Sequence, residues 1–429
     1  MRARMSTTFR SLRVRNYRLF AGGQLIKLIG VWMMYVAQDW LVLELTDNSP
    51  TALGLVTALQ FVPVMLLTLY AGTLADRFDK RTLLMISNGA WAVLAVMQAV
   101  LIATGAIRYW HILIFAGLLG IAQAIETPVR QAFVSELVGK DLLPNALSLS
   151  AATFQTARIT GPALAGVAIA ALGTGPVFLI STVMAIAPVF MQWQMRPAEL
   201  IRPELPPRDE KARVTDGLKY VRNRHDLVLP MAMMFVIAMF GYNFQLTLAL
   251  LAKTVFATGA ATFGLFNTAL AVGSLAGALA GTARKGRPSV YVLLAAAVAF
   301  GVLAVAVGFA PYRWLVLALL VPTGFSTVFL AQAANQRVQL GVDGAFRGRV
   351  MALYVLIFLG TAPVGSMVIS WVVERFGAAA GIWLGGAVSL LAAVVCLVWQ
   401  LRHAGDRLSI QVRPSPRVCV VHADNVVTV

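Results

Sequence analysis

The chain has 429 residues, of which 59% are hydrophobic and only 12% are charged, and its mean hydropathy is +0.78. A soluble domain carries roughly 25% charged residues, so this composition excludes an ordinary soluble globular protein. The net charge of +17 does not indicate a nucleic-acid partner, because the basic residues lie in the gaps between apolar segments. Two cysteines are too few for a disulfide framework or a metal site, and we expect no metal and no cofactor.

Apolar segments of about 20 residues recur from end to end, each long enough to cross a ~30 Å hydrocarbon core as a helix. Backbone polar groups must be paired inside lipid, so such segments must be helical. We therefore predict an all-α membrane protein with twelve transmembrane helices at residues 18–43, 52–74, 82–104, 110–131, 147–170, 175–195, 227–251, 261–281, 289–309, 312–334, 349–372 and 378–401.

The two sets of six spans resemble each other. GTLA at 72–75 ends the second span and GALA at 277–280 ends the eighth, while Pro162 of the fifth span corresponds to Pro363 of the eleventh. Motifs at nearly one offset predict two pseudo-symmetric six-helix bundles. The predicted domains are an N-terminal bundle (1–195), a cytoplasmic linker with an amphipathic helix (196–226), a C-terminal bundle (227–401) and a cytoplasmic tail (402–429) that we expect to be a short solvated extension.

The distribution of basic residues predicts the orientation. Of the 35 Lys and Arg residues, 29 fall in segments on one side, four fall on the opposite side, and Lys27 and Arg158 lie within spans. By the positive-inside rule, the basic side is cytoplasmic. We therefore expect a multi-pass protein of the cell inner (plasma) membrane with both termini in the cytoplasm. No cleavable signal peptide is evident in the first span.

A charged segment, GTLADRFDKR at 72–81, follows the second span on the predicted cytoplasmic side. It resembles the loop signature of the major facilitator superfamily, although Asp79 stands where that signature has Gly. Gly72 would permit close helix contact, and Asp76 would face the positive N-terminus of a helix from the other half. The basic residues would pair with acids at the same level. The alternative is a positively charged loop without a gating role. The predicted cytoplasmic gating loop comprises Gly72, Asp76, Arg77, Lys80, Arg81 and Glu136.

The fifth span contains ARITGPALAG at 157–166. This segment resembles a motif of drug:proton antiporters in the same superfamily, with Ala157 and Ala165 in place of glycines. Small residues permit close helix contact, and a proline frees a carbonyl and can bend the helix. Ordinary small-residue packing is the alternative. The predicted helix-bend motif comprises Gly161, Pro162 and Gly166.

Charged residues inside the spans cost roughly 2.5–3.5 kcal/mol each at a helix centre, so we expect them to face a cavity and to pair. Asp39 and Glu126 are candidate proton-coupling acids, because a carboxylate can be charged when hydrated and neutral when occluded. Alternatively, Asp39 only reaches the interface, and Glu126 forms a structural pair with Arg130 or Arg158. Spans of the second half hold no acid and offer neutral polar side chains. The predicted proton-coupling and substrate-cavity residues are Glu126, Asp39, Arg158, Lys27, Arg130, Tyr242, Asn243, Gln245 and Gln332.

Several segments together resemble the bacterial exporter branch that includes siderophore (enterobactin) exporters and macrolide efflux pumps: FRSLRVRNYRLF, VAQDWLVLELT, GTLADRFDKRTLL, RQAFVSELV, ARITGPALAG and DGLKYVRNRHDL. The resemblance implies a proton-driven secondary active exporter, an antiporter for drug or siderophore efflux, which moves a bulky, largely apolar small molecule by alternating access. The alternatives are a lipid or lysophospholipid transporter or an uptake permease and, less favoured, a membrane-embedded non-transport protein.

No H-E-x-x-H and no P-loop sequence occurs, so we do not expect an enzyme. The expected partners are a small-molecule substrate, protons and the lipid bilayer, with no nucleic acid. The chain is expected to be monomeric.

Overall fold

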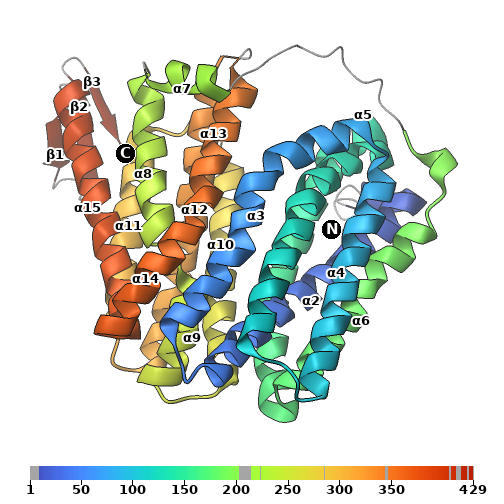
Figure 1. Cartoon of the computed structure of the whole chain (residues 1–429). Helices are drawn as coiled ribbons and strands as arrows, with labels where there is room; N and C mark the ends of the chain where they lie inside the picture. The colour runs from blue at the N-terminus through green and yellow to red at the C-terminus, as the bar shows by residue number, and fades with distance from the viewer. Residues whose placement is uncertain are drawn as a thin grey trace. The chain divides into compact units, whose positions relative to one another are not determined.

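The computed structural model describes residues 9–201, 214–222, 224–284, 286–343, 346–404, 407–411, 417–422 and 425–428. Helices make up nearly all of the described residues before residue 405 (Figure 1). The first half contains the short 3₁₀ turns η1 (Arg10–Arg13) and η2 (Pro197–Glu199) and the helices α2 (Arg15–Leu45), α3 (Pro50–Arg77), α4 (Lys80–Ala103), α5 (Tyr109–Leu172) and α6 (Thr174–Trp193). After α7 (Val214–Arg222) come α8 (His225–Phe240), α9 (Phe244–Leu250), the π-helical turn η3 (Leu251–Val255), α10 (Ala260–Ala283), α11 (Val290–Gly308), α12 (Arg313–Gly341), α13 (Arg347–Gly360), α14 (Ala362–Phe376) and α15 (Ala378–Ala404).

Polar caps fix where two of the first helices begin. Ser49 Oγ accepts a hydrogen bond from the Ala52 backbone at 3.2 Å, and Pro50 occupies the first helical position of α3. Asp79 caps α4, because its Oδ2 accepts from the backbone N–H of Thr82 at 2.9 Å and from the Thr82 hydroxyl at 2.8 Å. The departure from the superfamily's glycine at position 79 therefore supplies a helix cap.

The fourth and fifth predicted spans are joined in one 64-residue element, α5. Its backbone leaves the helical conformation at Gly139, where φ is 70° and ψ is 178°. Glycine adopts positive φ without a steric penalty, so the chain changes direction there between two helices. Within the described ranges, eleven helices are long and apolar enough to cross a membrane. The second part of α5, which carries the predicted span 147–170, is not among them.

Two predicted spans of the second half are broken rather than continuous. Span 227–251 contains the end of α8 at Phe240 and the start of α9 at Phe244. Span 349–372 contains the boundary between α13 and α14, which lies at Thr361. Both regions are still long and apolar enough to cross a membrane. The interruptions were not predicted, because the apolar content of a span does not determine the backbone conformation at a single residue.

Gly241 lies in the first of these breaks, where neighbouring atoms leave no room for a side chain. An added Cβ would lie 2.7 Å from a ring carbon of Phe300 and 2.8 Å from Ser389 Oγ. The missing Cβ therefore allows this part of the chain to approach α11 and α15 closely.

The described helices form two compact units, and these do not follow the two halves of the sequence. Unit 1 comprises Met1–Glu210, Gln245–Ala271 and Ala362–Ala378, and unit 2 comprises Lys211–Phe244, Val272–Thr361 and Ala379–Val429. Unit 1 thus combines the helices of the first half with α9, part of α10 and α14. Within it, α14 packs beside α3 (Figure 1). The predicted bundles 1–195 and 227–401 remain a proposal about which parts move together.

An apolar cluster fixes α2 against α5 in unit 1. Tyr17 and Phe20 of α2 are buried beside Phe133 of α5, and the rings of Phe20 and Phe133 meet edge to face at 5.8 Å. The Tyr17 hydroxyl donates to the Ala146 carbonyl at 2.8 Å, which holds the second part of α5 to the same helix. Residues that follow Phe20 on α2 are consequently placed opposite residues that precede Phe133 on α5.

The tail contains a small sheet that the sequence analysis missed. Strands β1 (Arg407–Gln411), β2 (Arg417–His422) and β3 (Asn425–Thr428) pair antiparallel in the order β1-β2-β3. The register aligns Leu408 with Val420 and Val421 with Val426. The strands were not predicted, and the expectation of a solvated tail remains a prediction. Valine-rich segments such as RVCVVH favour strands, because β-branched side chains fit an extended backbone.

Candidate functional site

Three charged side chains meet between α2 and α5 inside unit 1. Lys27 Nζ lies 3.2 Å from Glu126 Oε1, and Arg130 Nε lies 3.1 Å from the same oxygen. The three side chains are 7%, 9% and 19% exposed, respectively. Glu126 and Arg130 are four residues apart and therefore share one face of α5. We call Lys27, Glu126 and Arg130 the charged triad. It contains the pairing with Arg130 that was one alternative for Glu126, with Lys27 as a further partner.

Two buried amides extend the charged triad into a polar network. Lys27 Nζ donates to Asn88 Oδ1 of α4 at 2.7 Å, and Asn88 Nδ2 donates to Gln192 Oε1 of α6 at 3.3 Å. Both amides are 1% exposed. Asn88 and Gln192 were not among the predicted site residues. The available signal was the presence of uncharged amides within apolar spans, which are costly in lipid unless they are paired.

Arg158 does not join the charged triad. Its guanidinium lies over the Trp32 ring of α2, 5.8 Å from the ring centroid, and it forms no ion pair with any residue that the structure describes. The pairing of Glu126 with Arg158, which the sequence left open, is therefore not observed. A guanidinium over an indole is stabilised by the negative face of the ring.

The second buried acid, Asp39, contacts a residue more than two hundred positions away in the chain. Gln245 Nε2 of α9 donates to Asp39 Oδ2 of α2 at 2.8 Å. Asp39 is 4% exposed and belongs to unit 1 together with Gln245. Asp39 is therefore buried among the helices of unit 1. This hydrogen bond joins a first-half helix to a second-half helix.

The small residues of the fifth predicted span form two close helix contacts in unit 1. A Cβ on Gly161 would lie 2.5 Å from Trp32 Cβ and 3.0 Å from the Ile29 carbonyl, both in α2. On the other side, a Cβ on Gly264 of α10 would lie 2.6 Å from the Pro162 carbonyl and 2.9 Å from Gly166 Cα. Gly161, Pro162 and Gly166 thus lie at contacts to α2 and α10. The bend at Pro162 remains a prediction.

Alanine at Gly264 is expected to separate α10 from α5, because the obstructing atoms belong to the backbone and cannot rotate away. Overpacking of this kind costs about 1–3 kcal/mol. We expect Gly264→Ala to lower the melting temperature of the purified protein. Gly117→Ala is the matched control, since no atom lies within 4 Å of a Cβ at Gly117. Equal melting temperatures for the two variants would contradict the close contact.

A further contact in unit 1 holds α3 to α14. Ser366 Oγ donates to the Gly54 carbonyl at 3.2 Å, and the hydroxyl of Thr51 donates to the Glu374 carboxylate. Together with the Asp39–Gln245 bond, these contacts connect the helix ends that the predicted topology assigns to the outer side. We call the contacts of Asp39–Gln245, Gly54–Ser366 and Pro162–Gly264 the outer seam.

The remaining predicted cavity residues lie in unit 2, where most are already hydrogen-bonded. Tyr242 donates to the Thr327 carbonyl at 3.0 Å, and Asn243 donates to the Met239 carbonyl of the preceding turn at 2.9 Å. The Oε1 atom of Gln332 is buried and has no hydrogen-bond partner among the described residues. Tyr242 and Asn243 therefore stabilise the broken helix, and a substrate contact for these residues remains a prediction.

The gating loop is described only in part. Lys80 Nζ lies 2.6 Å from Glu136 Oε1, which unites two predicted loop residues. Arg81 was expected to pair with an acid but instead donates to the carbonyls of Gln192 at 3.1 Å and Trp193 at 3.2 Å, at the end of α6. That end supplies unpaired carbonyls, which attract a guanidinium. The side chains of the other predicted members lie outside the described residues: Gly72, Asp76 and Arg77.

A second ionic cluster, in unit 2, was not predicted as a site. Asp226 pairs with Arg224 at 2.9 Å and with Arg287 at 2.6 Å, and Arg224 also donates to the Gly341 carbonyl at 2.9 Å. The cluster links the starts of α8 and α11 to the end of α12. Its sequence signal, basic residues in two separate connections, was attributed only to the positive-inside rule.

Buried acids in the described part of the chain are held by amides and cations. No group of three or more His, Cys, Asp or Glu residues in that part could hold a metal ion. Asp39 faces an amide and Glu126 faces two cations. The chemistry open to these two carboxylates is the gain and loss of a proton and the exchange of a charged partner.

The chain is similar in sequence to two named transporters and similar in fold to solved membrane-protein structures. The chain is 28% identical over 263 residues to the Staphyloferrin A transporter of Staphylococcus aureus, a match that covers 60% of this chain and 64% of that protein. It is 26% identical over 345 residues to the multidrug efflux pump Tap of Mycolicibacterium fortuitum, covering 77% of this chain and 82% of the pump. The chain thus spans less than two thirds of the length of the first of these relatives.

The solved structure of the nucleoside transporter NupG superposes with a TM-score of 0.71 over 89% of this chain and 98% of that protein, at 10% identity. This match confirms the predicted helical membrane fold of the major facilitator type. The sequence profile described as "Transmembrane secretion effector" matches residues 6–424. The chain therefore belongs to the transmembrane secretion effector family of major facilitator proteins, and the two named relatives are transporters.

Proposed function

We propose that this transporter is a proton-driven exporter that moves a bulky, largely apolar small molecule out of the cell by alternating access. The observation that carries the proposal is the buried hydrogen bond between Asp39 and Gln245 in the outer seam. A carboxylate at this position is buried when the outer ends of the helices close, so closure depends on whether the carboxylate carries a proton. The proposal assigns the proton to Asp39 in preference to Glu126, because Glu126 is held by two cations.

The proposed cycle follows from the cost of burying charge. When the outer seam is open, Asp39 is hydrated and can be ionised. Closing the seam buries this carboxylate beside an amide, and an uncompensated buried charge is expensive. A proton taken up from outside removes that charge and favours closure. Release of the proton to the cytoplasm, in exchange for substrate, would reset the cycle. A potential of ~100 mV adds about 2.3 kcal/mol per proton.

The cytoplasmic side of the proposal uses the gating loop. The Lys80–Glu136 pair is 14% and 7% exposed and joins α4 to α5 within the predicted N-terminal bundle, so it would fix the position of the gating loop on that bundle. We further propose that both termini lie in the cytoplasm, that the protein works as a monomer in the inner membrane, and that the bundles 1–195 and 227–401 rock about the substrate.

Substrates named for the relatives are the first probes of this chain. A siderophore such as staphyloferrin A and the drugs of a multidrug pump are the two classes that the proposal covers. A lipid or lysophospholipid transporter and an uptake permease remain the competing functions, and the same assay separates them from export.

The test uses everted membrane vesicles from cells that express the chain. With an imposed gradient, acidic inside, vesicles should accumulate staphyloferrin A or an apolar fluorescent drug. A protonophore should remove the accumulation. Accumulation that persists with the protonophore would contradict proton coupling. Accumulation in right-side-out vesicles alone would indicate uptake, and movement of a fluorescent lysophospholipid alone would indicate lipid transport.

A further inference from the structure

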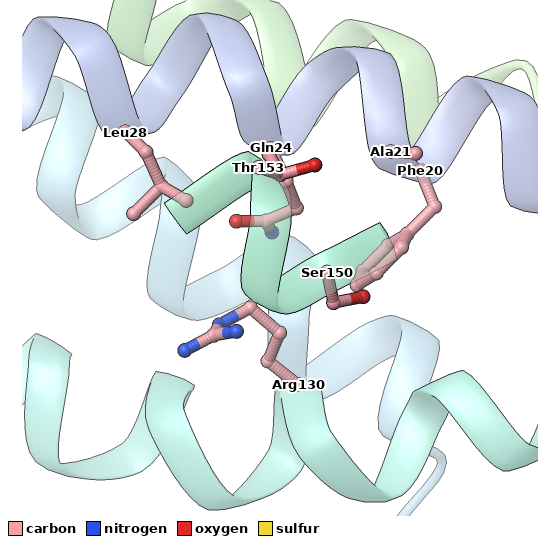
Figure 2. Close-up of a pocket in the computed structure, with 7 residues that line it drawn as sticks. All are labelled: Phe20, Ala21, Gln24, Leu28, Arg130, Ser150 and Thr153. Atoms are coloured by element: carbon pink, nitrogen blue, oxygen red, sulfur yellow. The ribbon is translucent and has the colours of Figure 1, made fainter. Parts of the chain in front are cut away.

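A small pocket lies beside the charged triad, between α2 and the two parts of α5 (Figure 2). Its polar lining consists of Gln24, Arg130, Ser150 and Thr153, and its volume is about 10 Å³. A space of this size holds roughly one water molecule or one oxygen atom of a larger group. The pocket belongs entirely to unit 1.

Gln24 is the unsatisfied polar group of this pocket. It is 5% exposed, and neither its amide nitrogen nor its amide oxygen has a hydrogen-bond partner within the described chain. Figure 2 shows its amide and the Arg130 guanidinium facing the same space from opposite sides. Buried amides are nearly always hydrogen-bonded, so this arrangement indicates a missing partner that can accept hydrogen bonds.

Arg130 also has unused donors. Its Nε atom faces Glu126 at 3.1 Å, while its two terminal nitrogens donate to no residue that the structure describes. The edge carrying these nitrogens can bind a carboxylate, because guanidinium nitrogens lie in a plane that matches the two carboxylate oxygens. Ser150 adds a hydroxyl to the lining of the same pocket.

The charge of the surroundings favours an anion. The charged triad contains two cations and one carboxylate, which leaves one positive charge without a counterion among the described residues. Arg158, over Trp32, adds a second cation without an acidic partner on the same two helices. Buried charges are normally balanced, so an excess of positive charge predicts that a negative group binds there during function.

An aromatic surface continues from the pocket along the same helices. Leu28 lines the pocket, and Trp32 follows it one turn along α2. The Trp32 ring contacts Phe154 at 6.1 Å and Tyr35 at 5.9 Å, and Phe154 remains 38% exposed. Spacings of four residues on α2 place these side chains on one helix face. A ring or apolar body attached to the anion would contact Trp32 and Phe154.

We propose that this pocket is the substrate subsite for an anionic group, with a carboxylate bound by Arg130 and Gln24 and the apolar body of the same molecule on Trp32 and Phe154. This inference rests on the proposed export function and narrows its substrate class to amphipathic acids. One carboxylate oxygen enters the pocket, and the Gln24 N–H and the terminal Arg130 nitrogens donate to the group.

The test is a binding measurement with a matched pair of probes. Phenylbutyrate and its neutral primary amide differ only in the group that the pocket would bind. By calorimetry on the purified full chain in an uncharged detergent, phenylbutyrate should bind at least about tenfold more tightly, as expected for a buried charge-assisted contact. Equal affinities would overturn the proposal. Equally tight binding of inorganic phosphate would overturn the substrate assignment in favour of a general anion site.

The substitution Gln24→Glu places a carboxylate where the ligand's carboxylate is proposed to lie. It should abolish the preference for the acid and leave the affinity for the neutral amide within about twofold, while raising the melting temperature by pairing with Arg130. Gln24→Met, of similar size and uncharged, removes one of the proposed donors and leaves Arg130 in place, so it should retain a reduced preference for the acid. An undiminished acid preference in Gln24→Glu would contradict the proposal.

This experiment is independent of the proton gradient. If phenylbutyrate binds selectively but is not exported in vesicles, the subsite stands and the proposed function fails. If drugs are exported in a gradient-dependent manner while the acid and the amide bind equally, the function stands and the subsite fails.

Discussion

Replacing Asp39 with Asn is expected to abolish gradient-driven export while leaving the folded protein intact. The Asn side-chain oxygen can still accept the hydrogen bond from Gln245, so the outer seam can close. Asn cannot release a proton, so closure no longer depends on proton uptake. In everted vesicles, accumulation should fall by about tenfold or more, in line with the loss of the ~2.3 kcal/mol per proton that a ~100 mV potential supplies.

Two further measurements separate coupling from general damage. Asp39→Asn should retain substrate exchange down a concentration gradient, which needs closure of the seam but no net proton movement. Asp47→Asn is the matched control, because Asp47 is exposed just beyond α2 and its positive φ of 50° is tolerated by Asn. Gradient-driven accumulation by Asp39→Asn at the rate of the unchanged protein would show that the proton binds elsewhere.

Glu126→Gln is expected to destabilise the protein rather than only uncouple it. The change removes the single acid of the charged triad and leaves Lys27 and Arg130 buried without a counterion. Breaking a buried pair in this way costs about 3–5 kcal/mol. We expect a large fall in melting temperature and in the yield of monodisperse protein, measured by size-exclusion chromatography with fluorescence detection.

A compensating change tests the cause of that loss. Adding Lys27→Gln to Glu126→Gln restores the original net charge of the cluster and should recover much of the stability. Glu199→Gln is the matched control: its partner Arg196 is 65% exposed, and an exposed pair contributes about 0–1 kcal/mol. A Glu126→Gln protein as stable as Glu199→Gln would contradict the structural role of the triad.

The membrane class and the family could be predicted from the sequence because they depend on the combined hydropathy, charge placement and motifs of many residues. Apolar length and the placement of basic residues act over whole spans, and one exception does not change the result. The fifth predicted span illustrates the limit. Residues 147–170 contain Arg158 and several hydroxyl side chains, so their apolar signal is weaker than that of the other spans, although the helix is present in α5.

The contacts of the candidate site were harder to predict. Asp39 and Glu126 were recognisable because a charge in lipid is costly wherever it lies. Arg130 was predicted as a partner of Glu126 because it lies one turn away on the same helix. The partners from other helices were not predicted, since Gln245 lies in a distant helix and Lys27 reaches α5 from α2. Sequence spacing gives neighbours within one helix and says nothing about which helices meet.

The breaks at Gly241 and Thr361 were missed for a related reason. Both lie inside long, mainly apolar segments, whose overall hydropathy does not mark the point at which the helix stops; the local signals were the Gly-Tyr-Asn sequence at 241–243 and Gly360 and Pro363 around Thr361. They also lie near the ends of Gln245–Ala271 and Ala362–Ala378, the two second-half segments that belong to unit 1. We infer that these breaks allow the outer helix ends to pack separately from the rest of their own spans.

The most direct test of the account measures protons and substrate together. Addition of staphyloferrin A or another transported compound to the purified protein in weakly buffered solution should release about one proton per molecule bound, because substrate and proton compete through the same cycle. Asp39→Asn should bind the compound and release none. Equal proton release by Asp39→Asn, or binding without release by the unchanged protein, would contradict the assignment of Asp39 as the coupling acid.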